Sequence, residues 1–123
     1  MKKIATEKAP QAIGPYSQAV ASDNFVFTSG QIAIDPSTNQ LTEDDIEKQT
    51  IRVLENIRHI LIAAGTSMEK VVKTTVFLAD INDFAKMNEV YEKYFSHRPA
   101  RSTVQVAKLP KNAKIEIDVI AEK

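Results

Sequence analysis

The segment from Thr42 to Ala64 constrains the fold most, because it carries a long apolar pattern at helical spacing. Its apolar residues recur three or four positions apart, with charged residues between them, at Ile46, Val53, Leu54, Ile57, Leu61 and Ala64. We expect an amphipathic helix here. Thr42 or Asp44 is suited to cap its start, and Gly65 is suited to end it in the left-handed conformation.

A second amphipathic pattern and five extended segments account for most of the remaining chain. Phe84 to Phe95 predicts a helix that begins after the possible caps Asp80, Asn82 and Asp83 and ends near Ser96. The predicted strands cover Tyr16 to Ala21, Phe25 to Ser29, Val71 to Leu78, Ser102 to Val106 and Lys114 to Ala121. The first two form a hairpin around Asp23 and Asn24. The order is ββαβαββ, an α+β fold.

Several predicted strands carry apolar side chains on both faces. Alternation places Ile115, Ile117 and Val119 on one face of the last strand and Glu116, Asp118 and Ile120 on the other. Two helices cover only one face of a sheet, so the second face is either an exposed apolar patch or a contact with another copy. The contact is physically favoured, which predicts a homo-oligomer of unspecified size.

Composition restricts the function. The 123 residues suit one domain, residues 1–123, and the 16 basic residues balance the 16 acidic ones. The formal net charge is therefore zero, so no overall electrostatic field attracts nucleic acid or anionic lipid to the protein. The chain has no cysteine and only two distant histidines, His59 and His97, which argues against a metal site.

The sequence shows neither a signal peptide nor the roughly 18 consecutive apolar residues of a membrane span, so we expect a cytoplasmic protein.

Two charged residues are the main catalytic candidates. Arg101 lies between a loop restricted by Pro99 and the start of a strand, where a guanidinium can bind a carboxylate through two hydrogen bonds. Glu116 lies within a strand, and cover by another subunit would raise its pKa towards the range of an acid/base catalyst. The alternatives are a surface or interface ion pair for Arg101 and a solvent-facing position for Glu116.

Other polar candidates have weaker signals. Gly14 and Gly30 allow close approach of a ligand to the backbone, and Tyr16 and Ser29 offer hydroxyls nearby, although ordinary turns explain the same pattern. Asn88 follows an apolar position of the second helix, and its spacing favours solvent over the edge of a pocket. No serine has a visible His/Asp partner for hydrolase chemistry.

The chain resembles the Rid family nearly from end to end. The motifs that carry the resemblance are Ala12-Ile-Gly-Pro-Tyr-Ser-Gln-Ala19, Phe27-Thr-Ser-Gly-Gln-Ile32, Asn56 with Ala64-Gly65, Val72-Lys-Thr-Thr-Val-Phe77, Asn88-x-x-Tyr91, Pro99-Ala-Arg-Ser102 and Ile115-Glu-Ile117. Each motif is weak alone, but their order and spacing together are highly specific. Within the family, the chain is most similar to the 2-iminobutanoate/2-iminopropanoate deaminase branch.

The resemblance implies a chorismate-mutase-like fold and a homotrimer with a central barrel and three clefts between subunits. It implies that Arg101 anchors a substrate carboxylate and that Glu116 positions water, with no cofactor. The cleft would also be lined by Tyr16, Ser29, Gly30, Asn88 and Thr103. Thr103 replaces the family's usual cysteine, and the loop from Phe95 to Pro99 is shorter than in many members.

The implied reaction converts a 2-imino acid, or its enamine, to a 2-keto acid and ammonia. Such imines arise from pyridoxal-phosphate-dependent dehydratases. One alternative is a non-catalytic trimer that binds metabolites and regulates a partner, in which Glu116 would be dispensable. Another is an RNA-cleaving translation inhibitor, which the zero net charge and the lack of a basic aromatic stripe argue against.

Overall fold

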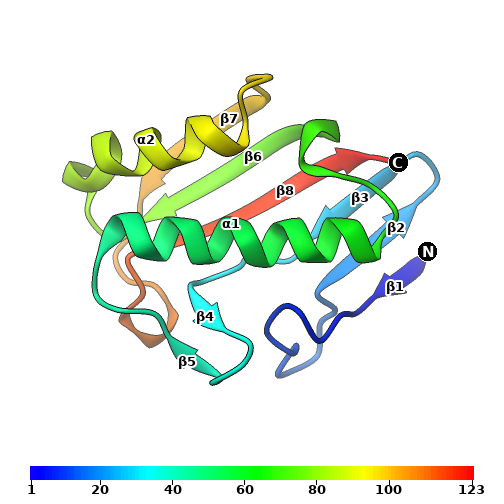
Figure 1. Cartoon of the computed structure of the whole chain (residues 1–123), viewed down its shortest axis with the longest axis horizontal. Helices are drawn as coiled ribbons and strands as arrows, with labels where there is room; N and C mark the ends of the chain where they lie inside the picture. The colour runs from blue at the N-terminus through cyan, green and yellow to red at the C-terminus, as the bar shows by residue number, and fades with distance from the viewer.

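Two helices pack on one face of a six-stranded mixed sheet in the computed structural model, which describes residues 1–123 (Figure 1). The sheet has the order β1-β2-β3-β8-β6-β7, and β4 and β5 form a separate small hairpin. The elements are β1 (Lys2–Ile4), β2 (Ala19–Ser22), β3 (Phe25–Thr28), β4 (Ile34–Asp35), β5 (Gln40–Leu41), α1 (Ile46–Ala63), β6 (Val71–Leu78), α2 (Phe84–Tyr94), β7 (Ala100–Gln105) and β8 (Ile115–Glu122). The predicted α+β class is confirmed, and neither helix is long and apolar enough to cross a membrane.

Helix α1 forms where the apolar pattern predicts it, but the expected caps were wrong. The side chain of Asp45 accepts a hydrogen bond of 2.8 Å from the Lys48 amide and begins the helix. Thr42 and Asp44 precede this position and cap nothing. Gly65 takes a φ of 82°, the left-handed conformation that the sequence indicates.

The short strands differ from the predicted pattern. Tyr16 to Gln18 are not in a strand, because β2 begins only at Ala19. Strands β1, β4 and β5 were not predicted, since two or three residues are too few to show an alternating pattern. Helix α2 ends at Tyr94, two residues before the expected Ser96.

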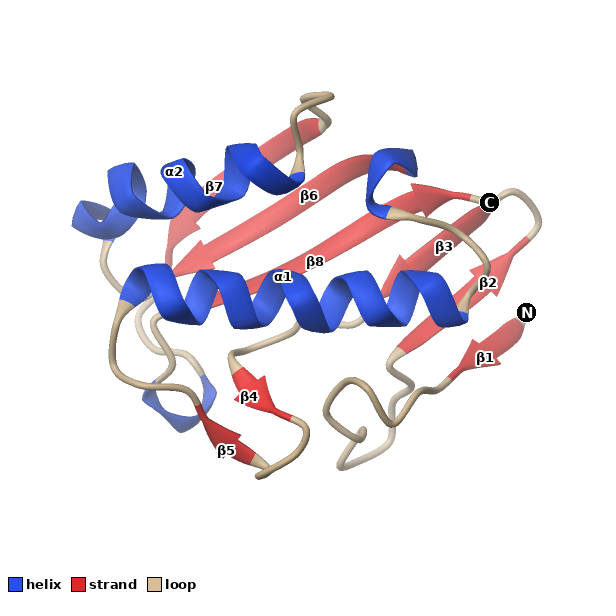
Figure 2. Cartoon of the chain, in the orientation of Figure 1, coloured by secondary structure: helices blue, strands red, loops and turns tan.

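The two faces of the sheet have different environments. On β8, Ile115, Ile117 and Val119 are buried beneath the helices, while Glu116, Asp118 and Ile120 point to the other face, as predicted. No helix covers that second face (Figure 2). It exposes Phe25 and Phe27 by 40% each and Val104 by 45%. This open face is the one for which the sequence predicts a contact with another copy, and that contact stays a prediction.

Candidate functional site

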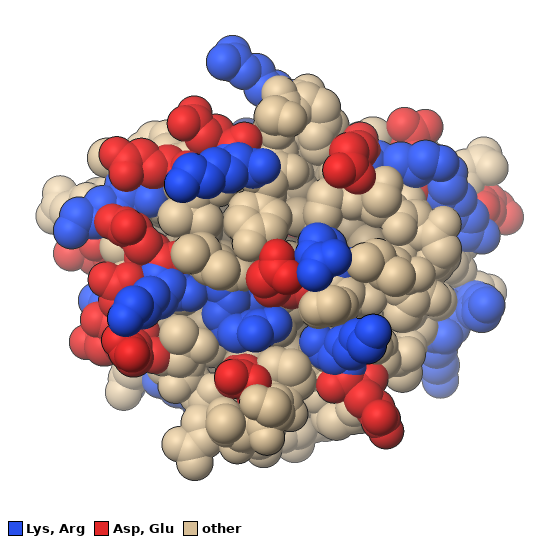
Figure 3. All heavy atoms as spheres, viewed as in Figure 1, with Lys and Arg blue, Asp and Glu red and all other residues tan.

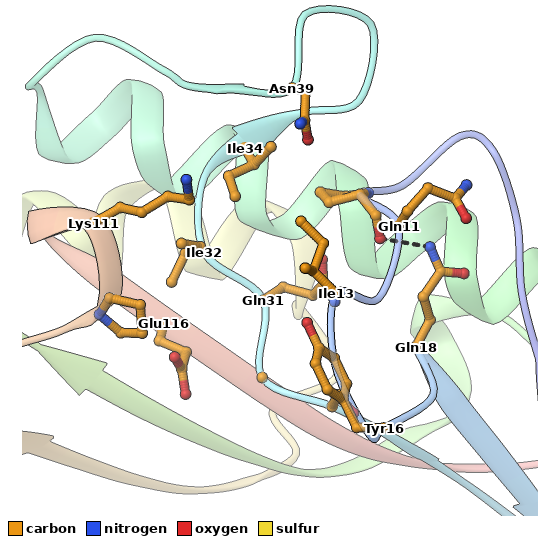
Figure 4. Close-up of a pocket in the computed structure, with 14 residues that line it drawn as sticks. Gln11, Ile13, Tyr16, Gln18, Gln31, Ile32, Ile34, Asn39, Lys111 and Glu116 are labelled. Atoms are coloured by element: carbon orange, nitrogen blue, oxygen red, sulfur yellow. Dashed lines mark hydrogen bonds between the residues drawn. The ribbon is translucent and has the colours of Figure 1, made fainter.

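A cavity of about 630 Å³ opens beside Glu116 and contains three other predicted residues, Tyr16, Ser29 and Gly30. Its walls come from the loop at residues 10–18, the segment at 29–39 and the turn at 110–111. Glu116 and Lys111 lie on one side of the cavity, and Ile13 and Tyr16 lie on the other (Figure 4). Glu116 and Lys111 are its only charged lining residues.

The Glu116 side chain lies directly against the backbone of Gly30. A Cβ atom at position 30 would lie 2.5 Å from Oε2 of Glu116 and 2.8 Å from its Cδ, so any other residue here would displace the carboxylate from its position. This contact explains the glycine better than a turn does, because the strain of a positive φ is not involved. Burial, and then the nearby charge of Asp118, raise the pKa of Glu116.

Ser29 and Tyr16 have different roles in the cavity wall. The Ser29 hydroxyl donates a 2.6 Å hydrogen bond to the Ser17 carbonyl, and the Ser29 amide donates to the Gln18 carbonyl. These bonds hold the 29–34 segment against the loop that carries Tyr16. Tyr16 is 53% exposed and lines the cavity, where its side chain is free to contact a ligand.

Arg101 lies in a second cavity, of about 530 Å³, between β7 and α2. Its Nη1 donates a 2.7 Å hydrogen bond to Oδ1 of Asn88, and its guanidinium carbon lies 4.7 Å from the centre of the Tyr91 ring and 5.3 Å from that of Phe84. The Tyr91 hydroxyl is in turn 2.7 Å from Oγ1 of Thr74. The guanidinium is thus held in place while most of its donors stay free.

The preference for a solvent-facing Asn88 was wrong, because this side chain is half-buried against Arg101. The sequence reasoning also missed Phe84 and Tyr91 as partners of the guanidinium. The signal was present in their spacing, since Phe84, Asn88 and Tyr91 lie four and three positions apart and share one face of α2. An arginine beneath that face contacts all three.

Arg101 and Glu116 do not meet in one chain. Strand β6 pairs with both neighbours, with Thr74 opposite Arg101 and Phe77 opposite Glu116. Paired residues point to the same face, and positions three apart on one strand point to opposite faces. Arg101 therefore lies on the helix face, and Glu116 lies on the open face. Each cavity holds one of the two predicted catalytic groups.

Thr103 lies on the helix face of β7, two residues after Arg101, but lines neither cavity. Its Oγ1 is buried and has no hydrogen-bond partner. Its expected contact with substrate stays a prediction. No group of three or more His, Cys, Asp or Glu side chains is arranged to hold a metal ion.

Comparison with known proteins gives matches over nearly the whole chain. The family model described as Endoribonuclease L-PSP matches residues 6–123. The 2-iminobutanoate/2-iminopropanoate deaminase of Homo sapiens is 53% identical over 119 residues, which cover 96% of this chain and 87% of that protein. A putative endoribonuclease from Thermotoga maritima has a TM-score of 0.98 at 55% identity, covering 100% of this chain and 98% of the other. TdcF of E. coli with bound serine has a TM-score of 0.95 at 47% identity, covering 100% and 99%.

Proposed function

Because the chain belongs to the Endoribonuclease L-PSP (Rid) family, we propose that it is a deaminase that hydrolyses 2-imino acids and their enamine tautomers. The substrates are small, such as 2-iminobutanoate and 2-iminopropanoate, and the products are 2-keto acids and ammonia. One observation carries the proposal, namely that a carboxylate with a raised pKa lies in a cavity. Relatives named Reactive Intermediate Deaminase A and 2-iminobutanoate/2-iminopropanoate deaminase support it.

The complete site forms between copies of a homotrimer. Arg101 lies on the edge strand β7, which has a partner on one side only, while Glu116 lies on the open face. When the β7 edge of one copy meets the open face of the next copy, Arg101 of the first copy lies beside Glu116 of the second. The same contact covers the exposed Phe25, Phe27 and Val104. A closed ring of three copies forms three such sites.

Arg101 binds the carboxylate of the substrate. Its contacts with Asn88 and the two rings of α2 hold the guanidinium in one orientation, which leaves donors for two parallel hydrogen bonds to an anion. A 2-imino acid bound in this way has its C=N carbon at a fixed distance from Arg101. Fixed position lowers the entropic part of the barrier to attack by water.

Glu116 moves the protons of the reaction. Its carboxylate takes a proton from water as the water oxygen attacks the C=N carbon, and the π electron pair of that bond passes to nitrogen, to which Glu116 gives the proton. In the resulting tetrahedral carbinolamine, Glu116 takes the hydroxyl proton as C=O forms and passes it to the nitrogen as the C–N bond breaks. Ammonia leaves and Glu116 regains its carboxylate form. A raised pKa suits a group that both takes and gives a proton near neutral pH.

The direct test is competition for a free imine. A threonine dehydratase releases 2-iminobutanoate in the presence of semicarbazide, which traps the imine as a semicarbazone. We expect the protein to lower semicarbazone formation and to raise 2-ketobutyrate by the same amount. The Glu116→Gln variant is the matched control, because it keeps the shape of the side chain without its carboxylate. Failure of the folded wild-type protein to divert the imine would contradict the proposal.

The same comparison of wild type with Glu116→Gln bears on a second candidate function, in which the protein is a non-catalytic trimer that binds metabolites. That function needs Arg101 but no ionisable group at position 116, so no diversion of the imine by either wild type or Glu116→Gln would favour it. Ribonuclease activity, which the family's name suggests, has less support. Basic and acidic side chains are interspersed on the helix face of the molecule and form no continuous basic surface there (Figure 3).

A further inference from the structure

We propose that Gln18 is a positioning residue that holds one wall of the Glu116 cavity, the segment at residues 5–17, in its substrate-binding shape. The inference rests on the proposed deaminase function, since it assigns Gln18 an effect on substrate affinity. Gln18 is only 3% exposed and lies just before β2. Gln18 is one of the residues that line the cavity, and its side chain points away from Glu116 into the segment, as Figure 4 shows.

The Gln18 carboxamide makes hydrogen bonds at both of its ends. Oε1 accepts a 2.7 Å hydrogen bond from the Thr6 amide. Nε2 lies within hydrogen-bond distance of three backbone carbonyls, those of Thr6 at 3.1 Å, Ala9 at 3.3 Å and Pro10 at 2.7 Å. The chain from Thr6 to Pro10 is therefore wrapped around one buried side chain.

The segment has few other ties. It contains no helix or strand, and its one backbone–backbone hydrogen bond joins the Tyr16 amide to the Gly14 carbonyl. The Ser29 hydroxyl holds its far end at Ser17, and Ala9 is buried in the core. Between those two points, Ile13 and Tyr16 are more than half exposed. The conformation of this wall therefore depends strongly on Gln18.

Only a carboxamide has the required hydrogen-bonding groups, one acceptor and two donor hydrogens. Glutamate at this position would face three carbonyl oxygens without a donor, and methionine of similar shape would offer neither group. Breaking these bonds leaves buried backbone groups unsatisfied, which favours opening of the segment. A substrate must then order the wall as it binds, and this cost raises KM without altering the chemical step.

The test combines amide hydrogen exchange at Thr6 with steady-state kinetics of Gln18→Met. We expect the Thr6 amide to exchange at least about tenfold faster in the variant, because its acceptor is gone. We expect KM to rise at least about tenfold while kcat changes less than about threefold. A merely structural role would instead reduce the fraction of folded enzyme, lowering kcat at an unchanged KM.

Gln49→Met is the matched control that distinguishes loosening of the segment at residues 5–17 from loosening of the whole protein. Gln49 is also fully buried, and its carboxamide bonds the carbonyls of Thr42 and Glu43 and the amide of Lys114, away from residues 5–17. Its substitution is expected to leave Thr6 exchange at the wild-type rate. Equal acceleration in both variants would overturn the inference, because it would show general loosening.

Two further measurements apply whatever the variant's yield or activity. Thr6 exchange in the wild-type protein at the rate of an unstructured peptide would overturn the inference without any substitution. Calorimetric titration with 2-ketobutyrate compares affinity in wild type and Gln18→Met when no turnover is seen, and Gln18→Asn, whose shorter side chain cannot reach the same partners, replaces a variant that does not fold. Active wild type with unchanged KM in the Gln18 variant would contradict this inference alone, whereas inactive wild type would contradict the proposed function.

Discussion

Arg101 and Glu116 lie on opposite faces of the same sheet, on the two strands that flank β6. Neither side chain can reach the other around the sheet within one chain. A reaction that needs both the guanidinium and the carboxylate is therefore impossible in an isolated subunit. If the proposed function holds, assembly is a condition for activity, and the open apolar face, for which a contact with another copy is predicted, also carries the proposed catalytic carboxylate.

Replacement of Arg101 by lysine separates charge from geometry. Lysine keeps the positive charge but loses the planar fork and the stacking on the α2 rings. We expect kcat/KM to fall about a hundredfold in Arg101→Lys and further in Arg101→Ala, with the oligomer retained. Steady-state assays and size-exclusion chromatography check both parts. Near-normal kcat/KM in Arg101→Lys would contradict bidentate binding.

Substitution of Gly30 by alanine tests the contact with Glu116. The new Cβ would clash with the Glu116 carboxylate, and we expect kcat to fall about a hundredfold because the carboxylate is displaced. We also expect the clash to lower the stability of Gly30→Ala, and this loss should disappear when Glu116 is also replaced by alanine, since the clash is then absent. Urea unfolding of both single variants and the double variant measures this coupling. Additive losses would contradict the contact.

The ring of Tyr91 is predicted to support Arg101. Tyr91→Leu removes the aromatic face beneath the guanidinium, and we expect KM to rise about tenfold. Tyr91→Phe keeps that face and loses only the hydroxyl bonded to Thr74, so it should cost about 1 kcal/mol of stability with little change in KM. Kinetics and urea unfolding distinguish the two. An equal rise in KM in both variants would assign the effect to the hydroxyl.

The pKa of Glu116 makes stability depend on pH. Burial raises this pKa above its usual value of 4.5, so the folded protein keeps the Glu116 proton to a higher pH than the unfolded chain does. Stability then falls as pH rises from the unfolded pKa through the folded one. Glu116→Gln cannot ionise, and we expect it to be more stable than wild type at about pH 7 and equal at about pH 4. Thermal unfolding at both pH values measures the difference, and a less stable variant at neutral pH would contradict it.

Long periodic elements were predictable from the sequence, and short or tertiary features were not. Residues 46–63 span several turns of one apolar face, so α1 was clear, whereas β4 and β5 are two residues each. The cap at Asp45 could not be chosen over Asp44, since adjacent acids differ only in the backbone angle that the fold imposes.

The candidate site shows the same division. Motifs identified Gly30 and Glu116, but their contact depends on where the segment after β3 crosses β8, at the bridge between Gln31 and Ile117. The separation of Arg101 from Glu116 follows from the register of both strands on β6, which no local pattern contains. Asn88 was misplaced for the same reason, because its partner lies thirteen residues away on β7.

Complementation between inactive variants tests the shared site most directly. Arg101→Ala and Glu116→Gln each lack one group, and each is expected to be nearly inactive alone. When the two chains are unfolded together in equal amounts and reassembled, each site between copies has about one chance in four of receiving both intact residues. We predict that the mixture recovers about a quarter of wild-type deaminase activity. No recovery in mixed trimers verified by native mass spectrometry would contradict a site built from two copies.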